Sequence, residues 1–126
     1  MSRKFSLCVF DDVLVGTTAT YTPTGFNDRL GMFDKISIQA IADQVSGTTP
    51  TLTVQIEHSG DQRNWSKKSG TAEISNRALV TTTTNVFDGS DGGAVPNHGF
   101  VRLAVSLGGT SPQAHVKIWV CLRDDS

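Results

Sequence analysis

The sequence TLTVQIEH, residues 51 to 58, alternates apolar and polar side chains without a break. Successive side chains of a β-strand point to opposite faces, so this alternation predicts a strand with one face in the core and the other in solvent. The expected inward set is Leu52, Val54, Ile56 and His58. This segment therefore makes a β-sheet protein the first expectation.

The rest of the chain repeats the pattern in segments separated by Gly, Pro and Asn, and no run is rich in the strong helix formers. About eight strands at this spacing predict an all-β fold, namely an antiparallel, jelly-roll-like β-sandwich, with a small β-barrel as the alternative. Besides 51–58, the expected strands are 5–15, 17–22, 33–45, 71–75, 79–87, 100–107 and 115–122.

Turn-forming residues indicate how the strands connect. Ser46–Pro50 separates strand 33–45 from strand 51–58, so these two strands are expected to form an antiparallel hairpin. Gly108–Pro112 predicts a second hairpin from the last two strands in the same way.

The N-terminal third of the chain carries two further signals. Asp11-Asp12 predicts a bulge or turn in the first strand, after which Val13 and Val15 resume the alternation. Residues 23–32 contain Pro, Asn, Asp and two glycines, which predict a loop. The large apolar side chains in that loop either cap one end of the core or form an interface.

Length and charge narrow the function classes. A chain of 126 residues predicts a single domain, 1–126, with one hydrophobic core. The net charge of -1 gives no electrostatic reason to bind nucleic acid or an anionic membrane. No convincing signal peptide or apolar membrane span is present, so we expect a soluble protein made in a reducing cytoplasm.

The two ends of the chain have complementary features. Cys8 and Cys121 lie in strand-like runs near the two ends of the chain, where free buried thiols are common and are expected here. The alternative is a Cys8–Cys121 disulfide, which requires the first and last strands to be neighbours, as a sandwich permits. Arg3 and Lys4 are basic, whereas Asp124-Asp125 is acidic. These charges can pair within one chain or between two copies if the ends lie close together.

Residues 57–61 contain groups that occur in catalytic sites, but their order favours a turn. His58 continues the inward face and Glu57 points the other way, so the two side chains cannot meet across a strand. Ser59-Gly60-Asp61 has the composition of a turn that leads to Trp65. No catalytic motif appears elsewhere, and we expect no enzyme.

Metal ligands are present without the spacing of a metal site. The histidines His58, His98 and His115 lie in separate elements, and the loop with Asp88 and Asp91 lacks the regular ligands of a calcium site. We therefore expect no metal and no cofactor.

Exposed apolar and aromatic groups are the remaining candidates for function. Trp119 is expected on the outer face of the last strand, where it is either covered by other elements or part of an interface. The expected contact residues are Ser2, Arg3, Lys4, Phe5, Phe26, Arg29, Leu30, Met32 and Trp119, together with the loop 88–99. Tyr21 and Trp65 are candidates for stacking on a sugar ring under an alternative function.

The segment GTTPTLTVQIEHSGDQRNW and the C-terminal VRLAVSLGGTSPQAHVKIWVCL resemble small β-sandwich virion proteins of tailed bacteriophages, loosely over residues 33–122. The resemblance implies a capsid decoration, or cement, protein on the outer capsid surface that bridges neighbouring major capsid subunits and copies of itself, a dimer by default. It carries over no catalytic residue. A carbohydrate-binding module and a phage tail or adaptor component are the alternatives.

Overall fold

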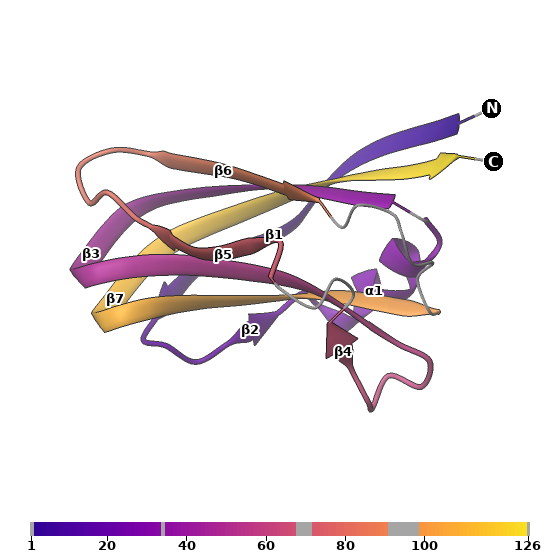
Figure 1. The fold of residues 1–126 in the computed structure, drawn as a ribbon, viewed down its shortest axis with the longest axis horizontal. Coiled ribbons are helices and arrows are strands. Elements are labelled where there is room, and N and C mark those ends of the chain that lie inside the picture. The colour runs from indigo at the N-terminus through magenta and orange to yellow at the C-terminus, as the bar shows by residue number, and fades with distance from the viewer. Residues whose placement is uncertain (1, 34, 68–71, 91–98, 126) are drawn as a thin grey trace.

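Two long strands, β3 (Lys35–Ser59) and β7 (Phe100–Asp125), form the frame of an antiparallel β-sandwich. The computed structural model describes residues 2–33, 35–67, 72–90 and 99–125. Within these ranges seven strands form one continuous hydrogen-bonded sheet that folds over on itself, with one helix at an end (Figure 1). The other elements are β1 (Ser2–Val15), β2 (Thr20–Tyr21), α1 (Thr24–Gly31), β4 (Ser66–Lys67), β5 (Ile74–Ala78) and β6 (Asn85–Ser90).

Both long strands bend at the same end of the molecule, which we call the corner, residues 43–51 and 108–115. On one side of the corner Lys35–Asp43 pairs with His115–Arg123, and on the other side Thr51–Ser59 pairs with Phe100–Gly108. The register shifts three times in between, which lets the ribbon turn from one layer to the other (Figure 1).

Each layer therefore contains half of β3 and half of β7. The first layer adds β1 beside β7 and β6 beside β3. The second layer adds β2 beside β7, with β4 and β5 beside β3. This arrangement confirms the predicted antiparallel sandwich and corrects both predicted hairpins. Strands 33–45 and 51–58 lie in opposite layers, and so do the last two strands. Strand 33–45 pairs with the last strand, and strand 51–58 pairs with strand 100–107.

The predicted inward faces of the long strands are confirmed. The side chains that alternate toward the interior are almost fully buried and meet between the layers, where they make the hydrophobic core. They are Ile36, Ile38, Ala40, Ala42, Leu52, Val54, Ile56, Val101, Leu103, Val105, Leu107, Val116, Ile118, Val120 and Leu122.

The first strand differs from the prediction in the place of its bulge. The register with β7 shifts between Cys8 and Phe10, so Val9 and Phe10 are both buried. One extra residue reverses the faces of everything that follows, which buries Leu14 and leaves Val13 and Val15 exposed. The prediction of a bulge at Asp11-Asp12 with Val13 and Val15 on the old face was wrong.

Residues 24–31 form α1 where the sequence predicted a loop. Leu30 is completely buried and Phe26 packs against the core, so the helix closes the end of the sandwich opposite the corner (Figure 1). Packing of these two side chains outweighs the low helix propensity of the Gly and Asn residues around them. Among the described residues, no helix has the length and apolar character that crossing a membrane requires.

The threonine-rich segment 79–87 was predicted as a strand, and the structure corrects this. Thr81–Thr84 lies in a turn, and β6 begins only at Asn85. The buried Asn85 side chain holds this turn: its Oδ1 accepts from the Val80 amide at 2.9 Å, and its Nδ2 donates to the carbonyls of Val80, Thr83 and Ala42. An amide that satisfies backbone groups locally favours a turn over a strand.

Candidate binding surfaces

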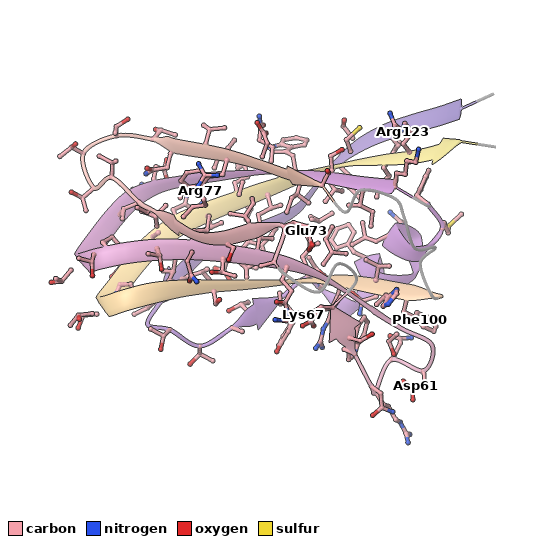
Figure 2. All side chains as sticks on the ribbon, in the orientation of Figure 1. Asp61, Lys67, Glu73, Arg77, Phe100 and Arg123 are labelled. Atoms are coloured by element: carbon pink, nitrogen blue, oxygen red, sulfur yellow. The ribbon has the colours of Figure 1, made fainter. Side chains whose placement is uncertain are left out.

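The segment Ser59–Asn64 is a hydrogen-bonded turn, as predicted. Ser59 Oγ accepts from the amides of Asp61 and Gln62, while Asp61 Oδ1 accepts from the amides of Arg63 and Asn64 at 2.9 Å each. The hydrogen bond from the Asn64 amide, and to a smaller extent that from the Arg63 amide, holds the pKa of Asp61 well below its usual range. Figure 2 shows Asp61 on this turn, outside the body of the sandwich. These polar groups stabilise the chain reversal.

Beyond the turn, Trp65 joins a cluster on the outer face of the second layer. The Arg102 guanidinium carbon lies 3.9 Å from the centroid of the Tyr21 ring and 4.3 Å from that of Trp65. Arg102 Nε also donates to Glu57 Oε1 at 2.8 Å. The structure thus brings together the two aromatic residues singled out for sugar stacking, and one face of each ring contacts a cation. Trp65 does not cover the core.

A shallow groove of about 620 Å³ crosses the outer face of the first layer. Trp119 projects from β7 into it and is 42% exposed. Gln39 faces Trp119 on β3, and Asp88 faces Gln39 on β6, so these three side chains form one row across the sheet. The outer position of Trp119 follows from the alternation of the last strand. Gln39 and Asp88 were missed because only the pairing of distant strands places them beside it.

His115 bridges two strands near the corner of the first layer. Its Nε2 lies 2.6 Å from Asp11 Oδ1 on β1, and its Nδ1 lies 2.9 Å from Asp43 Oδ1 on β3. Hydrogen bonds to Asp11 and then to Asp43 raise the pKa of His115 above its ordinary value of 6.5. An imidazolium donates from both nitrogens, so the protonated form satisfies both carboxylates.

The stability of the protein is expected to depend on the charge of His115. Because the folded-state pKa is raised, the stabilisation is fully present below pH 6.5 and is lost as the pH rises through the folded-state value. Unfolding temperatures measured across this range should decline more steeply for the wild type than for His115→Gln. Lys117→Gln, which leaves both contacts of His115 in place, should follow the wild type. Identical pH profiles for His115→Gln and the wild type would contradict this role.

The predicted contact residues fall into three groups. Phe5, Arg29, Met32 and Trp119 are exposed. Leu30 is buried in the core, so it is corrected from a contact residue to a packing residue, and Phe26 is half-buried against the same core. The side chains of Ser2, Arg3 and Lys4, and loop residues 91–98, lie outside the described residues.

The two ends of the described chain are neighbours. β1 pairs along its length with Gln113–Asp125 of β7, which places the backbone of Arg3 opposite that of Asp124. Cys8 faces Trp119 and Cys121 faces Ser6, and both cysteines are free and half-buried. Over the described ranges, no group of three or more His, Cys, Asp or Glu side chains is arranged to hold a metal ion; the predicted ligand candidates His98 and Asp91 lie outside them.

Comparison with known sequences gave no relatives. No protein-family model matches the chain, and a search of curated proteins found no significant match. The fold, in contrast, is similar to many solved structures.

Three of these structures represent the range. A chain of the infectious bursal disease virus Gx strain superposes with a TM-score of 0.64 at 11% identity, over 98% of this chain and 32% of that one. The CBM22-1 xylan-binding domain of Paenibacillus barcinonensis Xyn10C gives 0.57 at 8% identity, over 96% and 86%. The PBSX exported protein XepA gives 0.55 at 13% identity, over 94% and 36%. The chain thus spans about a third of the viral protein, and at these identities the likeness is one of fold.

Proposed function

We propose that this protein is a non-enzymatic structural component of a phage particle, a decoration protein that binds the outer surface of the capsid and bridges neighbouring capsid subunits. The observation that carries the proposal is the free edge of β1. This strand is 14 residues long and, within the described ranges, pairs only with β7. A long edge with unpaired amides and carbonyls is a template for a strand of another protein.

The side chains along β1 support a contact role. Phe5 is 53% exposed, Val13 is 49% exposed and Val15 is 72% exposed. Lys4 and the bulge at Val9 are features that protect natural edge strands, but large apolar groups exposed along an edge mark a contact site. The paired ends of β1 and β7 also extend past β3 as a two-stranded arm, which can reach a neighbouring subunit (Figure 1).

Copies of the chain itself are the second expected partner. The start of β1 is basic, with Arg3 and Lys4, and its second half is acidic, with Asp11 and Asp12. Antiparallel pairing of two β1 edges places unlike charges opposite each other, which suits a two-fold dimer. On the repeating surface of a capsid, several weak contacts made at once give a high overall affinity.

The similarity to viral proteins in fold agrees with this role, and the similarity to a xylan-binding domain keeps the alternative of a carbohydrate-binding module open. The sequence suggested that a sugar would stack on Tyr21 and Trp65, but the position of Arg102 is unfavourable for stacking there. The Arg102 guanidinium already lies over both rings. A sugar would have to use the opposite face of a ring or displace the cation.

The test is binding to capsid shells. Shells assembled from the major capsid protein encoded with this chain are mixed with purified protein and sedimented, and bound particles are imaged. We expect the protein to cosediment and to lie on the outer capsid surface. Density on the tail would favour the adaptor alternative, and failure to bind shells would overturn the decoration role.

Edge variants test the surface itself. Lysine on the β1 edge, as Val13→Lys with Val15→Lys, should weaken cosedimentation at least tenfold, because a desolvated edge contact does not tolerate buried charge. Val80→Lys is the matched control, since Val80 is 51% exposed but lies in a turn away from β1. Equal binding by both variants would remove β1 from the interface.

A further inference from the structure

The groove on the first layer has a composition that the decoration role does not use. Its walls come from β1, β3, β6 and β7, and its outward side chains include Ser6, Ser37, Gln39, Asp88, Trp119 and Cys121. These are hydroxyl, amide, carboxylate and thiol groups around one large ring. Small-molecule sites commonly combine such an apolar surface with a few convergent polar groups.

Trp119 supplies the apolar surface of the groove. Trp119 is the largest outward side chain on this layer and is 42% exposed. In contrast to Trp65, no cation contact within the described residues covers its ring. An indole on a flat sheet face presents a rigid apolar platform at low entropy cost, and it packs well against another flat apolar face.

Gln39 and Asp88 supply polar groups beside this ring. Within the part of the chain that the structure describes, the side chains of Gln39 and Asp88 make no hydrogen bond to protein. Gln39 lies one strand from Trp119 and Asp88 lies two strands away, which is about 5 Å and about 10 Å across the sheet. An amide and a carboxylate at these distances offer donors and acceptors to hydroxyl groups along a ligand about two sugar rings long.

From this arrangement we propose that the groove binds a neutral saccharide. The C–H face of one pyranose ring stacks on Trp119, and Gln39 and Asp88 hydrogen-bond to hydroxyl groups of that ring and the next. The ligand is neutral because Asp88 would repel a phosphate, sulfate or uronic acid, and none of the described residues that line the groove is Lys or Arg.

The two proposed surfaces are separate. Edge hydrogen bonds of β1 lie in the plane of the sheet, whereas the groove lies on its face, so both can be occupied at once. The saccharide proposal does not depend on the decoration role, and each is tested with a different ligand.

The experiment uses the full chain and neutral oligosaccharides of increasing length, built from glucose, xylose, galactose or N-acetylglucosamine. Binding is followed by titration calorimetry and by indole fluorescence. A second arm uses insoluble polysaccharides in pull-down, which separates recognition of a polymer surface from recognition of a free chain. We expect affinity to rise up to the disaccharide and then level off, since the row of polar groups ends at Asp88.

Variants assign the site. Trp119→Ala and Gln39→Ala should each weaken binding about tenfold or more, while Trp119→Phe should retain part of it. Val86→Ala, an exposed position of β6 outside the groove, should bind like the wild type. All these positions are exposed, so unfolding temperatures close to the wild-type value are expected and are measured first.

Each outcome decides the proposal. Loss of binding in both groove variants with Val86→Ala unaffected supports it. Loss in Trp65→Ala instead moves the site to the second layer and overturns it, and absence of binding to every neutral saccharide overturns it as well. Cosedimentation of Trp119→Ala with capsid shells is measured separately, so failure of the saccharide site is distinguished from failure of the decoration role.

Discussion

Replacing Gly109 with alanine is expected to lower the free energy of unfolding by about 3–5 kcal/mol, a large part of the total stability of a domain of this size. Gly109 has φ +108° and lies at the corner. A Cβ atom there would stand 2.7 Å from the carbonyl oxygens of both Thr48 and Thr49. Because the obstacle is backbone, no side chain can rotate away to relieve the contact.

Gly47 meets the same obstacle from the other strand. It has φ +109°, and an added Cβ would lie 2.7 Å from Ser111 O and 2.8 Å from the Pro112 Cα. The corner thus depends on two glycines that let β3 and β7 approach closely while the ribbon changes layer. We expect Gly47→Ala to destabilise about as strongly as Gly109→Ala.

Two other glycines serve as controls for chemical unfolding experiments. Gly16 has φ +82° but open space around it, so Gly16→Ala should cost only about 1 kcal/mol for the backbone conformation. Gly60 has neither positive φ nor a close neighbour, and Gly60→Ala should be nearly neutral. If the corner variants cost no more than Gly16→Ala, close packing at the corner is not what requires glycine.

Replacing Asn85 with alanine is expected to cost about 2–4 kcal/mol, the largest effect outside the corner. Its side chain is buried and makes hydrogen bonds to Val80, Thr83 and Ala42. Truncation removes these hydrogen bonds from a buried position, which costs the stabilisation that they give to the turn and to its contact with β3. The measurement is again the free energy of unfolding in denaturant.

Aspartate at the same position distinguishes the acceptor role of the Asn85 side chain from its donor role. Asn85→Asp keeps the acceptor for the Val80 amide but turns a second oxygen toward three carbonyls, so it should be at least as damaging as alanine at neutral pH. Thr83→Ala, which removes only an exposed hydroxyl, is the control and should be nearly neutral. A mild effect of Asn85→Ala would show that the turn is held by its backbone alone.

The corner matters for the proposed functions because it holds the two halves of β3 and β7 in place. The strands around the groove and beside the β1 edge depend on that arrangement. The groove needs β1, β7, β3 and β6 side by side, and β7 and β3 reach that layer only by passing through the corner. Within the described residues, β1 is hydrogen-bonded to β7 on one side and to no strand on the other. A strand that is held on one side only can accept a partner without breaking other pairs.

The alternation in Thr51–His58 and its relatives was sufficient to predict an all-β sandwich and the inward set of β3 and β7. This is because the two-residue period is local: whichever neighbours a strand has, the same side chains must leave water. The same logic placed Trp119 on an outer face. It failed at Val13 and Val15, since a bulge at Val9 reverses the faces and leaves no distinct mark in the sequence.

The helix and the turn at 81–84 were missed for a related reason. Residues 24–31 have weak helix propensity, and the helix exists because Leu30 and Phe26 fill the end of the core. The threonines at 81–84 have high strand propensity, yet they form a turn because the Asn85 side chain donates hydrogen bonds to the backbone carbonyls of Val80 and Thr83. At 24–31 a distant contact decides the structure, whereas at 81–84 the local hydrogen bonds of one buried side chain outweigh strand propensity.

By itself, then, the sequence determined the layer class, the buried faces and the Ser59–Asn64 turn, all of which depend on neighbours within a few residues. Only the tertiary structure decided that the ribbon of β3 and β7 folds at a glycine corner in place of two hairpins, and that Gln39 and Asp88 stand beside Trp119. An inward side chain is equally buried in two arrangements. The next strand in the sequence can pair with its strand in the same layer, or it can pack against it from the opposite layer. The choice is therefore made by register between segments far apart in the chain, which local periodicity does not encode.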